Sequence, residues 1–367
     1  MAAVFGIKGK FSVARLTGQR KNMLKIEERL VKTTTLFILP MAYALFWLST
    51  AHAQESSYAI SRDLPGISGV TVYTGAPRGF DPTTASAEDL QAYGYPRRPD
   101  SNDKKAYAMW RRAVATERVS AELVANPGRF HRPNQQVAAS PGVKNTTKTE
   151  SGNWSGYSLV GGSPVFDEVV GLWIVPNIGT QSESFTGYSS MWVGIDGNCS
   201  CDDLIQDGTE QDWIGVKAKY DAWIEFIPEP EMIVKNFPIQ PGDVISASSE
   251  VGTKDGVITG FYFIANFSTN KSVSASLAMP KGDTFSGKSA EWIFERTEVN
   301  GTFENPLPYY ADAYMDDAFA YRSGSTKSIG YLSEANQNIT MVDPNGKKLS
   351  QAAEQDTESM WFEWLAY

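Results

Sequence analysis

The 367-residue chain is predicted to be an all-β protein, a sandwich or barrel of antiparallel strands behind a partly helical N-terminal region. From residue 153 to the C-terminus, short runs rich in β-branched and aromatic residues alternate with turns that contain Gly, Pro, Asn or Asp. No amphipathic helical pattern of convincing length occurs in that range. Many short strands at regular intervals are typical of an antiparallel sandwich or barrel.

The expected strands are bounded by turn signals and cover residues 173–175, 192–196, 219–226, 244–247, 257–264, 272–278, 290–298, 318–321 and 339–342. With a period of two, residues 219–226 place Asp221, Trp223 and Glu225 on one face and apolar side chains on the other. Residues 290–295 repeat the arrangement. A solvated face would favour Lys, Thr and Ser over Trp, so these strands are expected to form the floor of a cleft.

Charge is unevenly distributed along the chain. Residues 151–367 contain 12 Lys and Arg against 30 Asp and Glu, whereas residues 1–150 contain 21 against 12. An acidic body argues against nucleic acid as a partner, because phosphates would be repelled. It suits a protein that works in acid, where many carboxylates are protonated and their mutual repulsion declines.

The histidines and cysteines restrict the chemistry of this body. The chain has only His52 and His131, both before residue 150, so Ser-His-Asp or Cys-His catalysis cannot be assembled within the acidic body. A His-ligated zinc site is excluded there for the same reason. Cys199 and Cys201 are separated by one residue, which is a poor spacing for a relaxed disulfide, so two free thiols are expected. No metal or cofactor is predicted.

Residues 1–53 are predicted to be a leader with a secretory signal peptide. A basic run at residues 25–32 precedes an apolar block at 36–48, and Ala51-His52-Ala53 provides a small-residue cleavage site. The block is too short for a comfortable membrane span, so export to the extracellular space is favoured over an uncleaved anchor.

Residues 54–146 are predicted to be a propeptide and linker. Ser86 begins a capping box before a short helix, a longer helix is expected from Asn102 to about Val124, and residues 129–150 have linker composition. Residues 54–150 contain 13 bases against 10 acids, opposite in sign to the body. Two interpretations remain open. The segment could occlude the cleft at neutral pH and leave in acid, or it could be a packing extension that stays attached.

Common catalytic motifs are absent from the sequence. It contains no Gly-rich nucleotide loop, nucleophile elbow, EF-hand loop or Asp-Thr-Gly element. A Ser-x-x-Lys match at Ser268 to Lys271 falls where a hairpin turn is expected, and the turn is the preferred interpretation.

Residues 147–367 resemble the glutamic peptidases (eqolisins, peptidase family G1). Five blocks occur in that family's order and spacing, at residues 153–156, 192–197, 204–208, 220–229 and 290–295. The resemblance implies a concanavalin-like sandwich of two antiparallel sheets of about seven strands each. It also implies a secreted proenzyme that cleaves proteins at acidic pH, with its own propeptide and protein or peptide substrates as partners. No membrane contact is expected after signal cleavage, and a monomer is the default.

The family's catalytic pair falls on Gln206 and Glu295. The resemblance implies that Glu295 is the general base that activates water and then the acid that protonates the leaving amine. Gln206 would donate its amide N–H to the developing oxyanion and help to orient the water. The expected substrate-binding residues are Trp154, Trp192, Trp223, Asp196, Asp221 and Glu225, to which Glu291 is added as a member of the carboxyl network. In the alternative, these tryptophans are core residues and the carboxylates are solvated.

Two other functions fit the same fold. A glycoside hydrolase could use two carboxylates such as Glu225 and Glu295 as acid and nucleophile. A noncatalytic module could bind carbohydrate or peptide. A carboxylate pair with no glutamine beside either member would favour the hydrolase, whereas an intact Gln206 and Glu295 speak against a noncatalytic module.

Overall fold

The computed structural model describes residues 58–134, 136–141, 146–180, 185–199, 201, 203–311 and 313–367. The predicted leader, residues 1–53, lies outside the described residues. The described residues form one compact unit. None of the helices that the structure describes is long and apolar enough to cross a membrane.

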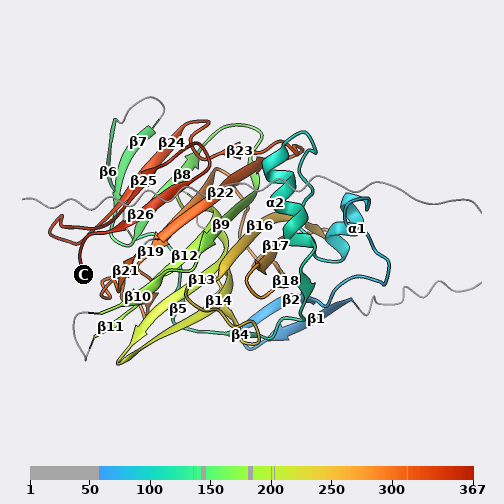
Figure 1. Ribbon diagram of the computed structural model, residues 1–367, viewed down its shortest axis with the longest axis horizontal. Helices are drawn as coiled ribbons and strands as arrows, with labels where there is room; N and C mark the ends of the chain where they lie inside the picture. Colours follow the sequence, from blue (N-terminus) through green and yellow to red (C-terminus); the bar gives the residue numbers. More distant parts are fainter. Residues whose placement is uncertain are drawn as a thin grey trace, which may run out of the picture. The chain divides into compact units, whose positions relative to one another are not determined.

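By their pairing, fourteen of the strands form two antiparallel layers of seven. Most of these strands are labelled in Figure 1. The first layer contains, in spatial order, β15 (Met232–Val234), β14 (Lys217–Ile227), β13 (Leu204–Ile214), β12 (Ser190–Asp196), β19 (Ser289–Glu295), β8 (Trp154–Val160) and β24 (Asn336–Val342). The second contains β18 (Lys271–Ala278), β17 (Val257–Asn266), β16 (Val244–Lys254), β9 (Phe166–Ile174), β22 (Ala313–Arg322), β26 (Met360–Trp364) and β25 (Lys348–Glu354). Because β24 also pairs with β25, the layers join along one edge. The predicted all-β sandwich is confirmed.

The core lies between the layers, where β12, β13 and β19 face β9, β16 and β17. Apolar side chains of the first layer point into it, and Ile224, Phe226, Trp292 and Phe294 are almost completely buried there. Burial of one such side chain stabilises the fold by about 1.5–3 kcal/mol. The predicted two-residue alternation of β14 and β19 is therefore confirmed. The other face of these strands carries the carboxylates together with Trp223 and Ile293.

Short strands extend or support the layers. β10 (Asn177–Gly179) pairs with β21 (Tyr309–Ala311), while β11 (Thr186–Gly187) and β23 (Ile329–Gly330) lengthen the edges of β13 and β22. The predicted turn at Ser268–Lys271 is confirmed between β17 and β18, where Asn270 has a φ of 56°.

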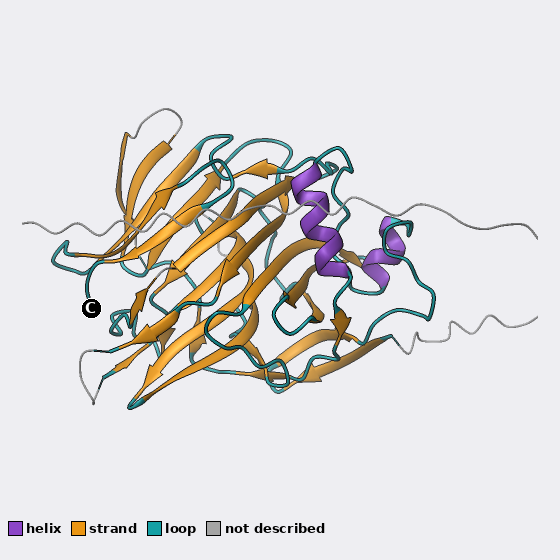
Figure 2. Cartoon of the chain, in the orientation of Figure 1, coloured by secondary structure: helices purple, strands orange, loops and turns teal. Residues whose placement is uncertain are grey.

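Two helices lie before the body (Figure 2). α1 (Ala87–Ala92) begins with the predicted cap, because the Ser86 hydroxyl accepts the Asp89 N–H at 3.0 Å. α2 (Lys104–Val114) packs on β9, β17 and β22 through Ala106 and Ala113. The expectation that this helix continues to about Val124 is wrong.

The chain turns from helix to strand after α2 because sheet edges are available to it. β3 (Glu117–Arg118) pairs in parallel with β18, and β4 (Leu123–Ala125) pairs with β15. The hairpin of β1 (Ala59–Leu64) and β2 (Ile67–Tyr73) also extends β18. Backbone hydrogen bonds to these edges replace those of a longer helix.

Residues 129–150 are also more structured than their linker composition predicts. β5 (Arg129–Phe130) pairs with β20 (Glu298–Val299), and β6 (Gln136–Pro141) pairs with β7 (Thr146–Ser151). β7 lies parallel to β24, so β6 and β7 belong to the body. Polar, Thr-rich strands can form here because backbone pairing to β24 supplies the contacts that apolar composition does not.

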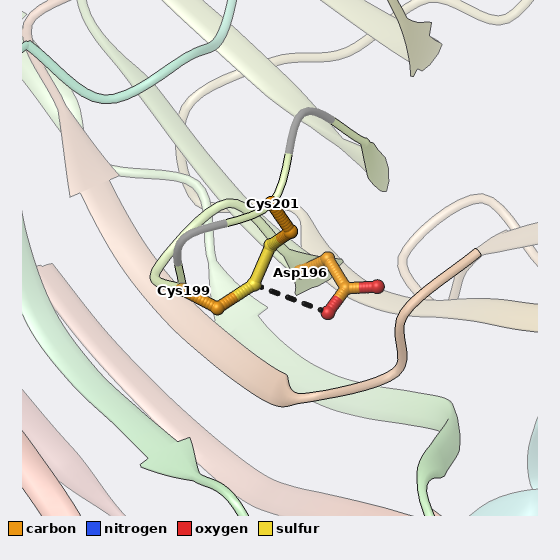
Figure 3. A group of neighbouring side chains, drawn as sticks. All are labelled: Asp196, Cys199 and Cys201. Carbon is orange, nitrogen blue, oxygen red and sulfur yellow. Dashed lines mark hydrogen bonds between the residues drawn. A yellow bond between two sulfur atoms is a disulfide. The ribbon is translucent and has the colours of Figure 1, made fainter. Parts of the chain in front are cut away.

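The expectation of two free thiols is wrong, because Cys199 and Cys201 form a disulfide (Figure 3). The chain reverses direction directly after β12, where Asp196 and Gly197 have φ values of 73° and 92°. The turn brings the two cysteine Cα atoms to 5.2 Å, within the range of a disulfide. Cys199 Sγ also lies 3.4 Å from Asp196 Oδ1.

Candidate active site

The polar face of the first layer carries the predicted site residues in cross-strand rows. Gln206 on β13 lies opposite Glu225 on β14, and Trp192 on β12 lies opposite Gly208 on β13. Gly208 in turn lies opposite Trp223. A Cβ at Gly208 would lie 2.6 Å from the Cβ of Trp192 and also against the Met191 carbonyl oxygen, so only glycine fits at this position.

Glu295, at the end of β19, is fully buried and accepts hydrogen bonds from three groups. The indole N–H of Trp192 donates to Oε2 at 2.8 Å, and the side-chain amide of Asn153 donates to Oε1 at 3.1 Å. Nδ1 of His131 lies 2.7 Å from Oε2. These donors hold a buried carboxylate in a fixed position and stabilise its negative charge.

Gln206 is also fully buried, and its amide nitrogen has two acceptors. Nε2 donates to Glu225 Oε2 and to the backbone carbonyl oxygen of His131, each at 2.6 Å. Gln206 Oε1 has no hydrogen-bond partner among the described residues. Burial raises the pKa of Glu225 to about 8 against the opposing effect of His131, so this carboxyl is neutral in acid and Oε2 still accepts.

His131 occupies the centre of this site, although it precedes the acidic body in the sequence. Its ring stacks on Trp223 at a centroid distance of 3.7 Å, and Nε2 lies 2.9 Å from Glu231 Oε2. Burial lowers the pKa of His131, but Glu295 and Glu231 outweigh burial and raise the pKa well above 6.5. Both ring nitrogens face carboxylates, and both donate only when the imidazole is protonated.

Two arginines fix the segment that carries His131. Arg129 forms ion pairs with Glu210 and with Asp212, the latter at 2.8 Å. Arg132 binds Glu298 through two nitrogens, at 2.7 and 2.9 Å. The three carboxylates are buried, and removing one partner of such an ion pair strongly destabilises the fold, because the other charge is left buried and unpaired.

The backbone of the same segment is bound as well. The His131 N–H donates to Glu225 Oε2 at 3.1 Å, and the Arg132 carbonyl accepts from Asn153 Nδ2 at 2.9 Å. The Asn134 N–H donates to Asn153 Oδ1 at 2.8 Å. Residues 129–134 therefore fill the site as an extended peptide.

Four of the other predicted residues have partners other than His131. Trp154 packs edge-on against Trp192, with ring centroids 4.9 Å apart. Asp196 accepts the backbone N–H groups of residues 287 and 288 next to the disulfide, and Asp221 pairs with Lys219. Glu291 accepts a hydrogen bond from the Ser158 hydroxyl at 3.2 Å. No contact with His131 is seen for any of these four among the described residues.

His131 is the site residue that sequence reasoning missed. Residues 151–367 contain no histidine, but the fold returns His131 from the preceding region to the acidic body. A signal was present in the flanking Arg129 and Arg132, because a short basic segment before an acidic domain can bind it.

One cluster here has the residue types of a metal site. Ligand atoms of His131, Glu210 and Glu231 lie within 4.8 Å of one another. The Arg129 guanidinium is already paired with Glu210 and lies 3.9 Å from Glu231, and the His131 ring adds a second positive charge. These two groups supply the charge that a cation would bring, so the residues do not fit a metal in this state.

The arrangement is suited to hydrolysis of an acyl bond. The Glu295 carboxylate and the Gln206 amide both bind His131. Glu295 contacts the His131 ring, and Gln206 donates to the His131 carbonyl oxygen. A general base and an oxyanion donor need this proximity to act on one carbonyl group. Glu225 has a glutamine beside it, which is not the arrangement expected of a glycoside hydrolase pair.

The chain is similar to several known proteins. Residues 152–364 match the Peptidase A4 family. The chain is 26% identical over 260 residues to aspergillopepsin-2 of Aspergillus niger, covering 66% of this chain and 88% of that protein. It is 28% identical over 261 residues to scytalidopepsin B of Scytalidium lignicola, covering 67% and 95%. The crystal structure of scytalido-glutamic peptidase with a transition state analog inhibitor covers 58% of this chain and 98% of its own, at 25% identity and a TM-score of 0.49.

Proposed function

The chain belongs to the Peptidase A4 family of glutamic peptidases, which hydrolyse peptide bonds, and on that premise we propose that Gln206 and Glu295 are its catalytic pair. We further propose that it is a secreted endopeptidase that acts in acid and is made as a proenzyme. The observation that carries the proposal is that both side chains bind His131, one at its carbonyl oxygen and the other at its ring.

In the proposed reaction, Glu295 removes a proton from the water that attacks the scissile carbonyl carbon. It then returns that proton to the leaving amine nitrogen. Trp192 and Asn153 hold the carboxylate in place through their N–H donors. The apolar and aromatic side chains around it exclude bulk water, which strengthens these interactions.

Gln206 donates its amide N–H to the carbonyl oxygen as that oxygen becomes negative. Its Oε1 atom, which has no partner among the described residues, can accept a hydrogen bond from the attacking water. An amide has the advantage over a carboxyl that it keeps both a donor and an acceptor across the acid range. Glu225 accepts from the same amide and so orients it.

The region before the body is proposed to inhibit the enzyme until it is removed. Of the two interpretations of residues 54–146, the occupied site supports occlusion over simple packing. His131 binds both members of the catalytic pair, and Arg129 and Arg132 are held by buried carboxylates on either side. A substrate cannot enter while these contacts persist.

Action in acid is supported by several buried carboxyl groups. Burial raises the pKa of Asp207 and Glu291 well above their ordinary values. These groups are neutral in acid, where burial costs little, and costly to ionise at neutral pH. Export is supported by the signal-like leader and by the Cys199–Cys201 disulfide, which suits an oxidising compartment.

The proposal is tested by assaying hydrolysis of a denatured protein at pH 3 and pH 7 with the parent and three variants. Glu295→Gln is expected to abolish hydrolysis, and Gln206→Ala to lower kcat about 10²- to 10³-fold, because an oxyanion donor is lost. Glu229→Gln is the control, a glutamate without contact to His131, and should remain active. Activity of both Glu295→Gln and Gln206→Ala equal to that of the parent would contradict the mechanism.

A further inference from the structure

The segment that fills the site is placed as a substrate would be. A scissile carbonyl must lie where the oxyanion donor reaches its oxygen and next to the general base. The His131 carbonyl oxygen is 2.6 Å from Gln206 Nε2, and the ring of the same residue is 2.7 Å from Glu295. The next carbonyl, that of Arg132, is bound by Asn153 instead.

We infer that the peptide bond between His131 and Arg132 is the bond that the enzyme cuts to release its own N-terminal region, and that the His131 ring prevents the cut until it is displaced. The inference rests on the proposed function. Arg129 and Arg132 anchor the peptide on both sides of this bond through Asp212 and Glu298, so the bond itself is held in place.

The position of the His131 ring explains why the bond survives while the ring is bound. Glu295 Oε2 already receives hydrogen bonds from Trp192 and from the ring, and Oε1 receives one from Asn153. The ring therefore occupies the second acceptor site of Oε2, so a water molecule cannot give its proton to that oxygen while the ring stays in place. Once the ring leaves, Oε2 is free to act as a base while Gln206 can still bind the carbonyl.

The reaction then follows the proposed peptidase mechanism. Water oxygen bonds to the His131 carbonyl carbon, and the water proton moves to Glu295. The carbonyl oxygen carries the negative charge and accepts from Gln206. Glu295 passes the proton to the Arg132 nitrogen, the C–N bond breaks, and the products are a carboxyl group on His131 and an amine on Arg132. The only co-reactant is water.

Acid is expected to displace the ring by discharging the carboxylates around it. The titratable and charged groups that face His131 come from every element packed on it, namely Glu210 on β13, Glu225 on β14, Glu231 before β15, Glu295 on β19 and Arg129 on β5. Burial raises the pKa of Glu231, but Arg129 and His131 outweigh burial and lower it to about 2. A lowered pKa means that this contact persists at higher pH and is lost as the pH falls towards about 2.

The strands that follow Arg132 belong to the body. β6 and β7 lie within the body, and β7 pairs with β24. Cleavage after His131 would therefore free the segment that contains α1, α2 and β1 to β5 without removing a strand of the sandwich.

The test is incubation of the purified full-length protein from pH 6 to pH 2, with the new N-terminus determined by intact mass and terminal sequencing. We expect the first new N-terminus at Arg132, a rate that is independent of protein concentration, and no cut in Glu295→Gln. Glu231→Gln should cut at higher pH than the parent, because it removes a charge that holds the ring. The control Glu229→Gln, which does not contact His131, should follow the parent.

The outcomes separate this inference from the proposed function. A first cut at another bond, such as that after Arg132, or a rate proportional to protein concentration, overturns the inference while hydrolysis of an added protein substrate still supports the peptidase. Glu231→Gln cutting at the same pH as the parent overturns the role of the ring. Absence of both self-cleavage and substrate hydrolysis contradicts the proposed function itself.

Discussion

Asp196 and Asp203 form a buried carboxyl pair that should make the fold more stable in acid than at neutral pH. Burial, followed by the charge of Asp203, raises the pKa of Asp196 from 3.8 to about 7, against two backbone N–H donors. At 1.36 kcal/mol per pKa unit, this difference corresponds to roughly 4 kcal/mol. Because the folded-state pKa is raised, the stabilisation is complete below 3.8 and is lost as the pH rises through about 7.

Replacing Asp203 with Asn tests this reasoning. Asp203 Oδ2 accepts the Ser286 N–H at 3.1 Å, which an Asn oxygen can continue to do, while the amide group replaces the negative charge beside Asp196. We expect an unchanged free energy of unfolding at pH 4 and a gain of about 1–2 kcal/mol at pH 8, because burial of Asp196 remains and only the charge of its neighbour is removed.

The assay is urea unfolding from pH 4 to pH 8, performed in the Glu295→Gln background so that self-digestion does not interfere. Asp255→Asn, at an exposed position with a φ of 51° that Asn also tolerates, is the control and should show no change with pH relative to the parent. A difference between Asp203→Asn and the parent that is the same at pH 4 and pH 8 would refute the reasoning.

Three further changes give different readouts. Arg97→Gln removes a guanidinium that pairs with Asp167, Glu168 and Glu250, so limited proteolysis at neutral pH should release the segment around α2 faster. The effect should diminish in acid, because burial raises the pKa of Glu168 well above its ordinary value and the carboxyl is then neutral. Equally faster release at both pH values would contradict this prediction. Gly208→Ala would place a Cβ 2.6 Å from Trp192 Cβ, so the soluble yield and near-UV circular dichroism should fall sharply, and a native-like spectrum would contradict the packing. Trp192→Phe removes the 2.8 Å bond to Glu295 and should lower kcat/KM about 10- to 100-fold at pH 3, because charge-assisted hydrogen bonds are worth about 1.5–3 kcal/mol; unchanged kinetics would exclude the contact from the mechanism.

The parts of the fold that depend on local pattern were predictable from the sequence. The alternation around Trp223 and Trp292 survives in the structure because one side of each strand faces the core between the layers. The cap at Ser86 and the turn at Ser268–Lys271 follow from local chemistry in the same way. For these elements, the tertiary contacts reinforce what the neighbouring residues already favour.

The parts that depend on distant partners were not predictable. α2 ends at Val114 because free sheet edges accept the following residues, and β7 forms because β24 lies beside it. The disulfide depends on the positive φ of Asp196, which periodicity does not reveal. His131 reaches Glu295 across 164 positions of sequence, and only the fold brings the two together. The pairing of Gln206 with Glu295 came from resemblance to a family, since no pattern in the chain joins them.

The central claim is that Gln206 and Glu295 act together on one carbonyl group. The most direct test is to measure kcat/KM at pH 3 for Glu295→Gln, Gln206→Ala and the double variant, each freed of its N-terminal region. Residues that act as a unit are not additive, so the double variant should be about as slow as the slower single variant. If the two losses multiply in full, the side chains work independently and the proposed mechanism is wrong.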